Sequence, residues 1–235
     1  MDDVHEDKAF MARRGAALER LDGVTGTKGG DPAERKAWFE EVYSSAGDDP
    51  AAVPWADLAP KQVLVDWLAE HPGEGRRAVD IACGLGDNAQ ALAAAGWKTS
   101  AFDFASAAIT WAKKRFPDTD VDFQVGDLFD LPEEWQGAFD LVHECYTLQA
   151  LSGALREASF ATVAELVKPG GRLLVITRVR PDDTQADGPP WPLTPSELAR
   201  FAELGFSEDS SLYYDVHRPD GRIIPHLCVV YRKPE

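Results

Sequence analysis

The sequence predicts an α/β fold: a Rossmann-like, doubly wound, seven-stranded and mostly parallel sheet with a terminal antiparallel hairpin, preceded by a helical cap. Short apolar runs alternate with helical patterns between residues 76 and 180, which is typical of parallel strands joined by crossover helices. A glycine-rich turn follows the first apolar run. At the end of the chain, two apolar runs joined by Arg-Pro-Asp-Gly predict an antiparallel hairpin.

The first 60 residues are expected to form the cap. Apolar residues recur at helical spacing over 7–21, and a second helical pattern over 32–46 begins with a proline, which suits a first helical turn. Prolines then punctuate a loop up to residue 60. We therefore assign residues 1–60 to a helical cap or lid and residues 61–235 to the main domain.

The main domain begins with an amphipathic helix that carries Val63, Leu64, Trp67 and Leu68 on one face. Strands and helices then alternate. Strands are predicted within 78–83, 98–104, 121–127, 139–146 and 168–180, and helices up to residue 95 and within 106–116, 155–167 and 195–206. The predicted hairpin occupies 210–233.

Composition excludes several classes of partner. The chain has 24 basic and 40 acidic residues and a net charge of −16, which disfavours binding to nucleic acid or to anionic membranes. No run of about 18 apolar residues is present, and the first residues lack the apolar core of a signal peptide. The three cysteines, Cys83, Cys145 and Cys228, lack metal-ligand spacing and are expected to be reduced thiols. We therefore expect a cytoplasmic protein without a metal site.

The glycine-rich turn suggests a nucleotide-like ligand. It contains Gly84-x-Gly86-x-x-Ala89, a loose form of the dinucleotide fingerprint, and Asp103 ends the second strand about 20 residues further on. A carboxylate there can accept hydrogen bonds from ribose hydroxyls. Both nicotinamide dinucleotides and S-adenosylmethionine are bound in this way, and a turn that serves only strand–helix packing is a third interpretation.

Acidic residues near the ends of successive strands favour one of these ligands over the other. Asp80, Asp103, Asp127 and Glu144 fall near the ends of the first four strands, and so at one edge of the predicted sheet. Such a cleft repels pyrophosphate and favours a cation, and S-adenosylmethionine carries a sulfonium and an ammonium group. Asp127, followed by apolar Leu128, also suits the amino group and ring of an adenine.

The ordered motifs resemble those of class I S-adenosylmethionine-dependent methyltransferases. "VDIACGLGDNAQALA" is similar to their first motif, "AFDFA" to the second-strand acid, and "VGDLFDLP" and "FDLVHECYTLQAL" to the third and fourth motifs. The terminal hairpin resembles the reversed seventh strand of that fold. "WFEEVYSSAGDDPAAVPWADLAP" resembles the N-terminal segment of the group around thiopurine, thiol or halide methyltransferases and the tellurite-resistance methyltransferase.

The resemblance implies S-adenosylmethionine as cofactor and a role for each matching residue. Gly84 and Gly86 would approach its methionine part, with Asp80 and Ala82 flanking the amino end and Glu144 nearby. Asp103 would hold the ribose, Phe104 would lie beside the adenine, Asp127 and Leu128 would frame that base, and Trp38 and Trp55 would be lid residues, although both tryptophans also suit ordinary core packing.

The expected reaction is methyl transfer to a small-molecule acceptor, with a thiol sulfur favoured because a thiol is partly ionised at neutral pH. An oxygen or nitrogen acceptor would often need a base, for which His143, Glu144 and Tyr146 are the candidates. Strand alternation sends His143 and Glu144 to opposite faces. We expect Glu144 to face the cleft and His143 to be packed and hydrogen-bonded.

Acceptor-facing residues are expected just after the fourth and fifth strands and in the proline-rich loop, at Tyr146, Gln149, Arg178 and Trp191. Arg178 could pair with a substrate carboxylate or with a surface acid, and Trp191 could contact the acceptor or only pin its loop. Three alternatives stay open: a non-catalytic S-adenosylmethionine-binding module, an NAD(P)-dependent oxidoreductase, and a methyltransferase acting on protein or nucleic acid. The oligomeric state is not predicted.

Overall fold

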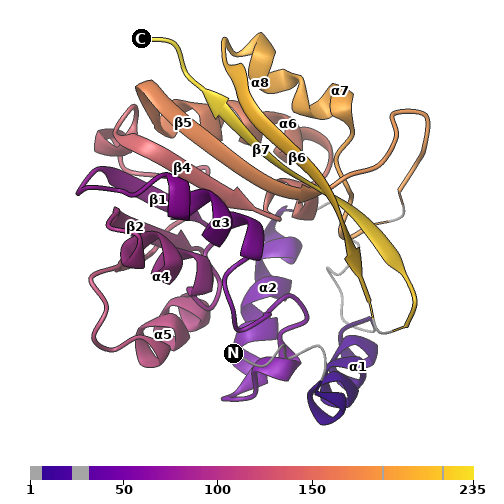
Figure 1. Cartoon of the computed structure of the whole chain (residues 1–235). Helices are drawn as coiled ribbons and strands as arrows, with labels where there is room; N and C mark the ends of the chain where they lie inside the picture. The colour runs from indigo at the N-terminus through magenta and orange to yellow at the C-terminus, as the bar shows by residue number, and fades with distance from the viewer. Residues whose placement is uncertain (1–6, 23–31, 187, 219) are drawn as a thin grey trace.

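The computed structural model describes residues 7–22, 32–186, 188–218 and 220–235, and within them seven strands form one sheet (Figure 1). The strand order is β3-β2-β1-β4-β5-β7-β6. The strands are β1 Arg77–Ile81, β2 Lys98–Asp103, β3 Asp122–Val125, β4 Phe139–Cys145, β5 Val167–Arg178, β6 Ser207–His217 and β7 Ile223–Arg232. Only the pairings of β7 with β5 and with β6 are antiparallel, so the predicted fold class is confirmed.

The helices follow the predicted alternation with one difference. They are α1 Lys8–Asp22, α2 Pro32–Ala46, α3 Gln62–Glu70, α4 Asp87–Ala94, α5 Ser106–Arg115, α6 Gly153–Leu166, α7 Pro195–Leu198 and α8 Arg200–Glu203. The single helix expected over 195–206 is instead two short helices that meet at Ala199, where ψ relaxes to −14°. None of the helices within the described residues is long and apolar enough to span a membrane.

Side-chain alternation along the strands builds an apolar layer on each face of the sheet. Ala78 of β1, Leu141 of β4 and Leu174 of β5 pack with apolar residues of α3 and α4. The residues beside them, including Val142 and Val175, pack with α6 and α8 on the other face. Both faces are covered, which explains why these strands read as continuous apolar runs.

The turn between β1 and α4 requires glycine at Gly86. Its φ of +87° lies in the left-handed region, and a Cβ placed there would lie 2.8 Å from Cζ of Phe123. Gly84 in the same turn also has a positive φ, of +53°. The glycine pattern therefore reflects a turn that brings bare backbone to the carboxyl edge of the sheet.

The cap packs onto the main domain through a shared apolar cluster. Tyr43 of α2 and Val53, which follows the short 3-10 helix Pro50–Ala52, are buried with Leu85, Ala108 and Trp111. Figure 1 shows α2 at the lower edge of the sheet, between α5 and the long β6–β7 hairpin. The cap is thus a separate segment of the sequence, but it contributes to the core of the domain.

Candidate functional site

The candidate site lies where β3, β2, β1 and β4 end side by side. The register pairs Ile81 with Phe102 and with Glu144, and pairs Asp103 with Val125, so the loops that follow these four strands share one edge. In open α/β sheets this edge is where ligands bind. The predicted acids are distributed along it, but their side chains have different partners.

Asp103 joins the end of β2 to the glycine turn. Its Oδ2 accepts a hydrogen bond from the backbone N–H of Gly84 at 3.0 Å, and its Oδ1 accepts one from Ala105 N–H at 2.9 Å. Burial raises the pKa of this carboxyl to about 6, although the two backbone hydrogen bonds oppose that rise and nearby Glu40 adds to it. A carboxylate held in this way has lone pairs left for ribose hydroxyls.

Asp80 and His143 form a buried pair on the α3–α4 face of the sheet. The Nδ1 of His143 lies 2.6 Å from Oδ1 of Asp80, and both side chains are at most 2% exposed. This confirms the expectation that His143 is packed and hydrogen-bonded. The other carboxylate oxygen of Asp80, Oδ2, is buried without a hydrogen-bond partner. A buried unpaired carboxylate oxygen is costly, and an ammonium group would satisfy it.

Glu144 at the end of β4 is buried and hydrogen-bonded to backbone. It lies on the opposite face from His143, as strand alternation predicts, but its side chain is fully buried and does not face an open cleft. Its Oε1 accepts hydrogen bonds from the backbone N–H groups of Thr147 and Leu148 and so holds the turn after β4. Burial raises its pKa to about 7. Its Oε1 therefore has a structural role, while Oε2 is buried without a hydrogen-bond partner among the described residues, and the expected roles in cofactor binding and catalysis stay predictions.

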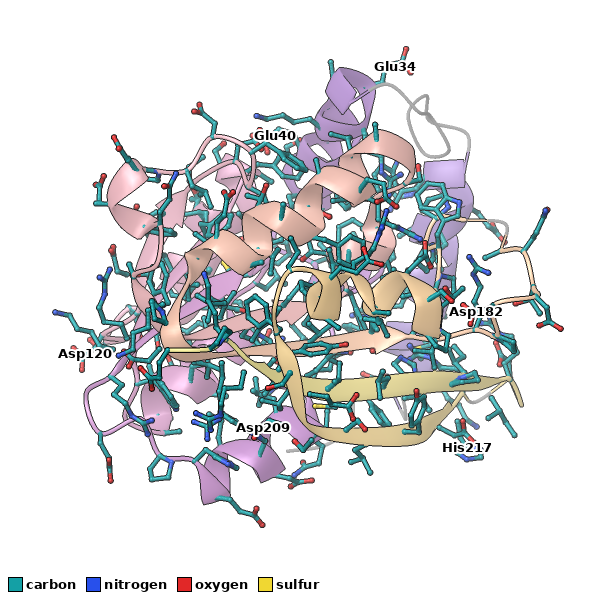
Figure 2. All side chains as sticks on the ribbon, turned by 90° about the horizontal axis from the view of Figure 1, so that it is seen from above. Glu34, Glu40, Asp120, Asp182, Asp209 and His217 are labelled. Carbon is teal, nitrogen blue, oxygen red and sulfur yellow. The ribbon has the colours of Figure 1, made fainter. Side chains whose placement is uncertain are left out.

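Helix α2 contacts all four loops at the edge. Lys36 Nζ lies 3.0 Å from Oδ2 of Asp127, after β3. Glu40 accepts hydrogen bonds from the backbone N–H and the hydroxyl of Ser106, after β2. Glu34 and Glu40, both on this helix, are labelled in the upper part of the view in Figure 2.

The other two contacts of α2 reach the loops after β1 and β4. The Tyr43 hydroxyl lies 3.0 Å from where a Cβ of Gly84 would be, and it accepts a hydrogen bond from Trp55 Nε1. Arg35 Nη2 donates to the backbone oxygen of Ala150 at 3.0 Å. None of these four α2 residues was predicted as a site residue, because only the fold brings them to the edge.

The predicted lid tryptophans belong to an aromatic cluster around α2. Trp38 and Trp55 have ring centroids 5.8 Å apart, and Phe39 lies between Trp55 and Phe104 at 5.2 and 5.6 Å. Trp38 is 7% exposed, and its Nε1 is buried without a hydrogen-bond partner. Phe104 therefore lies under the cap beside Asp103, as the expected adenine contact would require.

Asp127, Leu128 and Ala82 complete the predicted cofactor set. Asp127 is half-exposed and its Oδ1 accepts a hydrogen bond from Phe129 N–H, in addition to the Lys36 contact. Leu128 is buried in the core on the α6 face, and Ala82, with φ +49°, packs against the same core. Leu128 thus serves the core of the domain as well as the edge.

On the other side of the glycine turn, Tyr146 follows β4 in a strained conformation. Its φ is +69°, which is uncommon for an aromatic residue. Residues with such strained backbone conformations cluster at functional sites. Its hydroxyl lies 2.8 Å from Nε2 of His226 in β7, whose Nδ1 bonds to the backbone oxygen of Ile224. His226 is 80 positions away from Tyr146 in the sequence.

The remaining acceptor-side predictions differ in outcome. Gln149 is buried, and its Oε1 accepts hydrogen bonds from Arg178 N–H and the Thr177 hydroxyl, so it joins the loop after β4 to β5, and its contact with an acceptor stays a prediction. Trp191 is pinned by its backbone to Gln149 and Arg156, and Arg35 lies 5.5 Å from its ring. Arg178 has no ion pair with any residue that the structure describes.

Comparisons with known proteins find methyltransferases that are similar to this chain. Residues 78–171 match the family model of a methyltransferase domain. A demethylmenaquinone methyltransferase of Beutenbergia cavernae is 31% identical over 131 residues, covering 56% of this chain and 48% of that protein. A ubiquinone biosynthesis O-methyltransferase of Xanthomonas campestris is 29% identical over 196 residues, covering 72% of this chain and 80% of that one. The chain spans about half the length of the first of these relatives.

A solved structure supports the fold over a longer stretch. The 1,6-didemethyltoxoflavin-N1-methyltransferase of Burkholderia thailandensis, solved with bound 1,6-didemethyltoxoflavin and S-adenosylhomocysteine, has a TM-score of 0.64 and 20% identity, covering 87% of this chain and 91% of that one. The chain is therefore similar to a methyltransferase domain over residues 78–171, and it shares its fold with this solved methyltransferase.

Proposed function

We propose that this protein transfers a methyl group from S-adenosylmethionine to a small-molecule acceptor. The observation that carries the proposal is the edge itself: Asp80 and Asp103 flank a glycine turn whose backbone is covered by α2. The unpartnered Oδ2 of Asp80 fits the ammonium group of the cofactor, and Asp103 fits its ribose. A sulfonium cofactor supplies an already activated methyl group, so the protein's task is to align the acceptor with it.

The same residues argue against a nicotinamide cofactor. Asp80 is buried beside the turn and Glu40 adds a second carboxylate close to Asp103. A pyrophosphate at this turn would meet these negative charges, whereas a cation is stabilised by them. The acidic surface, with a net charge of −16, likewise favours a small molecule over nucleic acid as the acceptor.

A thiol acceptor remains our preferred assignment within this reaction, in keeping with the resemblance to thiopurine and thiol methyltransferases. His143 is bonded to Asp80, and Glu144 is bonded to backbone, so neither is placed as a base. A thiol needs no such base because it ionises near neutral pH. The three cysteines of the chain are free thiols, which is consistent with the reducing conditions of a cytoplasmic protein.

The test is an assay of S-adenosylhomocysteine release against matched aryl thiols, phenols, carboxylic acids and amines. Turnover of thiols, unchanged by His143→Gln in a protein that still binds the cofactor, supports methyl transfer to sulfur. Turnover of phenols or amines only would assign an oxygen or nitrogen acceptor. Binding of S-adenosylmethionine without any turnover would identify a binding module instead, and binding of NAD in its place would overturn the proposal.

A further inference from the structure

Arg178 is an unpaired cation in a strongly acidic protein. It ends β5, is half-buried, and has no ion pair among the described residues although the chain contains 40 acidic residues. Its Nε is buried without a hydrogen-bond partner. Leaving a guanidinium nitrogen desolvated and unbonded costs free energy, and an anionic partner would recover it.

The residues around Arg178 come from three adjacent strands. β4 and β5 are paired as far as Cys145 and Ile176, and Tyr146 N–H donates to the Ile176 oxygen at 3.1 Å. On the other side of β5, Arg178 is directly opposite His226 in β7. The guanidinium lies 5.9 Å from the centre of the Tyr146 ring, so the strained Tyr146 and its partner His226 border the cation.

This cluster adjoins the proposed cofactor site. The backbone N–H of Lys61 donates to Oδ1 of Asn88, two residues beyond Gly86, and the Lys61 ammonium lies 4.5 Å from the centre of the Tyr146 ring. Lys61 therefore connects the glycine turn to Tyr146. An acceptor bound at Arg178 would lie beside the cofactor and not at a separate face of the molecule.

The charges around Arg178 favour an anion. Lys61 and Arg14 share one carboxylate, that of Asp57, and Arg218 and Arg222 also act on Arg178, although Arg222 is 2.7 Å from Asp220. Arg178 itself has no ion pair among the described residues, so a single carboxylate on a ligand could pair with it. A carboxylate matches a guanidinium in charge and can bind it through two parallel hydrogen bonds.

Aromatic rings surround the same position. The ring of Tyr214 in β6 stacks on His226, with centroids 5.3 Å apart and an interplanar angle of 29°, and Tyr146 lies 5.7 Å from His226. Figure 2 shows His217, at the end of β6, and Asp182, in the loop after β5, on the same side of the molecule. These surroundings suit a flat apolar body attached to the anionic group.

We infer that Arg178 binds the carboxylate of the methyl acceptor, so that the substrates are aromatic monocarboxylic acids. This inference rests on the proposed function, since it assigns the substrate class of the same site. Arg178 fixes one end of the acceptor, and Tyr146 and His226 line the position between that end and the cofactor.

The experiment compares acids with their neutral amides. The full chain, saturated with S-adenosylhomocysteine, is titrated by ligand-observed NMR with benzoate, phenylacetate and indole-3-acetate and with the matching primary amides. We expect each acid to bind at least tenfold more tightly than its amide. Arg178→Gln should abolish that preference, Arg178→Lys should restore part of it, and Arg172→Gln, on the same strand but paired with Asp209, should leave it unchanged.

Each other result overturns the inference in a defined way. Equal binding of acids and amides, or undiminished acid binding by Arg178→Gln, would show that Arg178 does not recognise a carboxylate. Tighter binding of phenyl phosphate than of benzoate would assign a dianionic substrate. Calorimetry of S-adenosylhomocysteine in every variant separates the two proposals: failure to bind it contradicts the proposed function, whereas normal binding without an acid preference contradicts only this inference.

Discussion

At the scale of single residues, the site depends on carboxylates that the fold keeps out of water. Asp103 is 4% exposed and Glu144 is fully buried, and burial raises the pKa of both. The two differ in what their oxygens bind. Asp103 retains lone pairs beside the glycine turn, while Oε1 of Glu144 binds the backbone of its own loop and Oε2 is buried without a hydrogen-bond partner among the described residues. The pKa of Asp103 therefore bears on ligand binding, and that of Glu144 bears on the stability of the fold.

Cofactor binding should weaken in acid because of Asp103. Its pKa of about 6 means that the carboxyl protonates as the pH falls below 6, and only the ionised form accepts hydrogen bonds from both ribose hydroxyls. We expect the Kd of S-adenosylhomocysteine, measured by calorimetry, to rise by up to about tenfold per pH unit below 6. Asp103→Asn should bind about tenfold more weakly at pH 8 and lose this dependence. A wild-type affinity that is flat from pH 8 to pH 5 would contradict the assignment.

Glu144 should lower stability at neutral pH. Because its folded pKa of about 7 lies above its ordinary value of 4.5, its protonated form stabilises the fold fully below pH 4.5, and that contribution is lost as the pH rises through 7. Glu144→Gln keeps an acceptor for Thr147 and Leu148, so its free energy of unfolding should exceed that of the wild type at pH 8 by on the order of 3 kcal/mol, with no excess at pH 4.

Comparing Glu144→Ala with Glu144→Gln distinguishes a structural role of Glu144 from a catalytic one. Removing the acceptor leaves two buried backbone N–H groups unpaired and should cost about 2–4 kcal/mol in urea unfolding. Methyl transfer by Glu144→Gln should stay within about threefold of the wild type, since the turn after β4 is preserved. A hundredfold loss of activity in a stable Glu144→Gln would restore Glu144 as a catalytic residue.

At the scale of elements, helix α2 lies across the carboxyl ends of the strands and holds the loops that follow them. Its residues Lys36, Glu40 and Tyr43 lie at intervals of three or four, so they share one helix face, and each contacts a different loop. The ion pair between Lys36 and Asp127 is half-exposed and contributes little. The buried contact of Tyr43 with Trp55 and the glycine turn is the one expected to fix the helix.

Tyr43→Phe should weaken the contact between α2 and the glycine turn without unfolding the domain. The change leaves Trp55 Nε1 without its acceptor and removes the hydroxyl above Gly84. We expect S-adenosylhomocysteine to dissociate about three- to tenfold faster in stopped-flow fluorescence, in line with the loss of one partly buried hydrogen bond. Tyr213→Phe, at a tyrosine that is 63% exposed on β6, is the matched control. Equal dissociation rates in the two variants would remove α2 from the cofactor site.

The sequence predicts elements and strand-end acids well because both are local patterns. Asp103 was found from its spacing after the glycine turn, and the alternation of apolar runs gave all seven strands. The contact between Tyr146 and His226 was not predicted, because it depends on β5 lying between β4 and an antiparallel β7. For Glu144, strand alternation predicts the face of the side chain, but it does not predict the hydrogen bonds that Oε1 accepts from the backbone N–H groups three and four residues later.

At the scale of the whole molecule, the cap and the sheet share one core. Val53 and Tyr43 from the cap are buried with Ala105, Ala108 and Trp111, which belong to the segment after β2 and to α5. The cap therefore covers apolar surface that the main domain would otherwise expose to water. Separating the two would cost free energy in proportion to that area, so we propose that they unfold together.

This proposal predicts one unfolding transition. Val53 is fully buried, and Val53→Ala should lower the free energy of unfolding by on the order of 2 kcal/mol. If the chain unfolds as a unit, hydrogen exchange of the slowest amides in β1 and β4 should accelerate by the same factor as that of α2, about thirtyfold. Val216→Ala, at a half-buried position on the hairpin, should change both far less. Faster exchange confined to α2 would instead mean that the cap opens independently, and that cofactor entry needs no disturbance of the sheet.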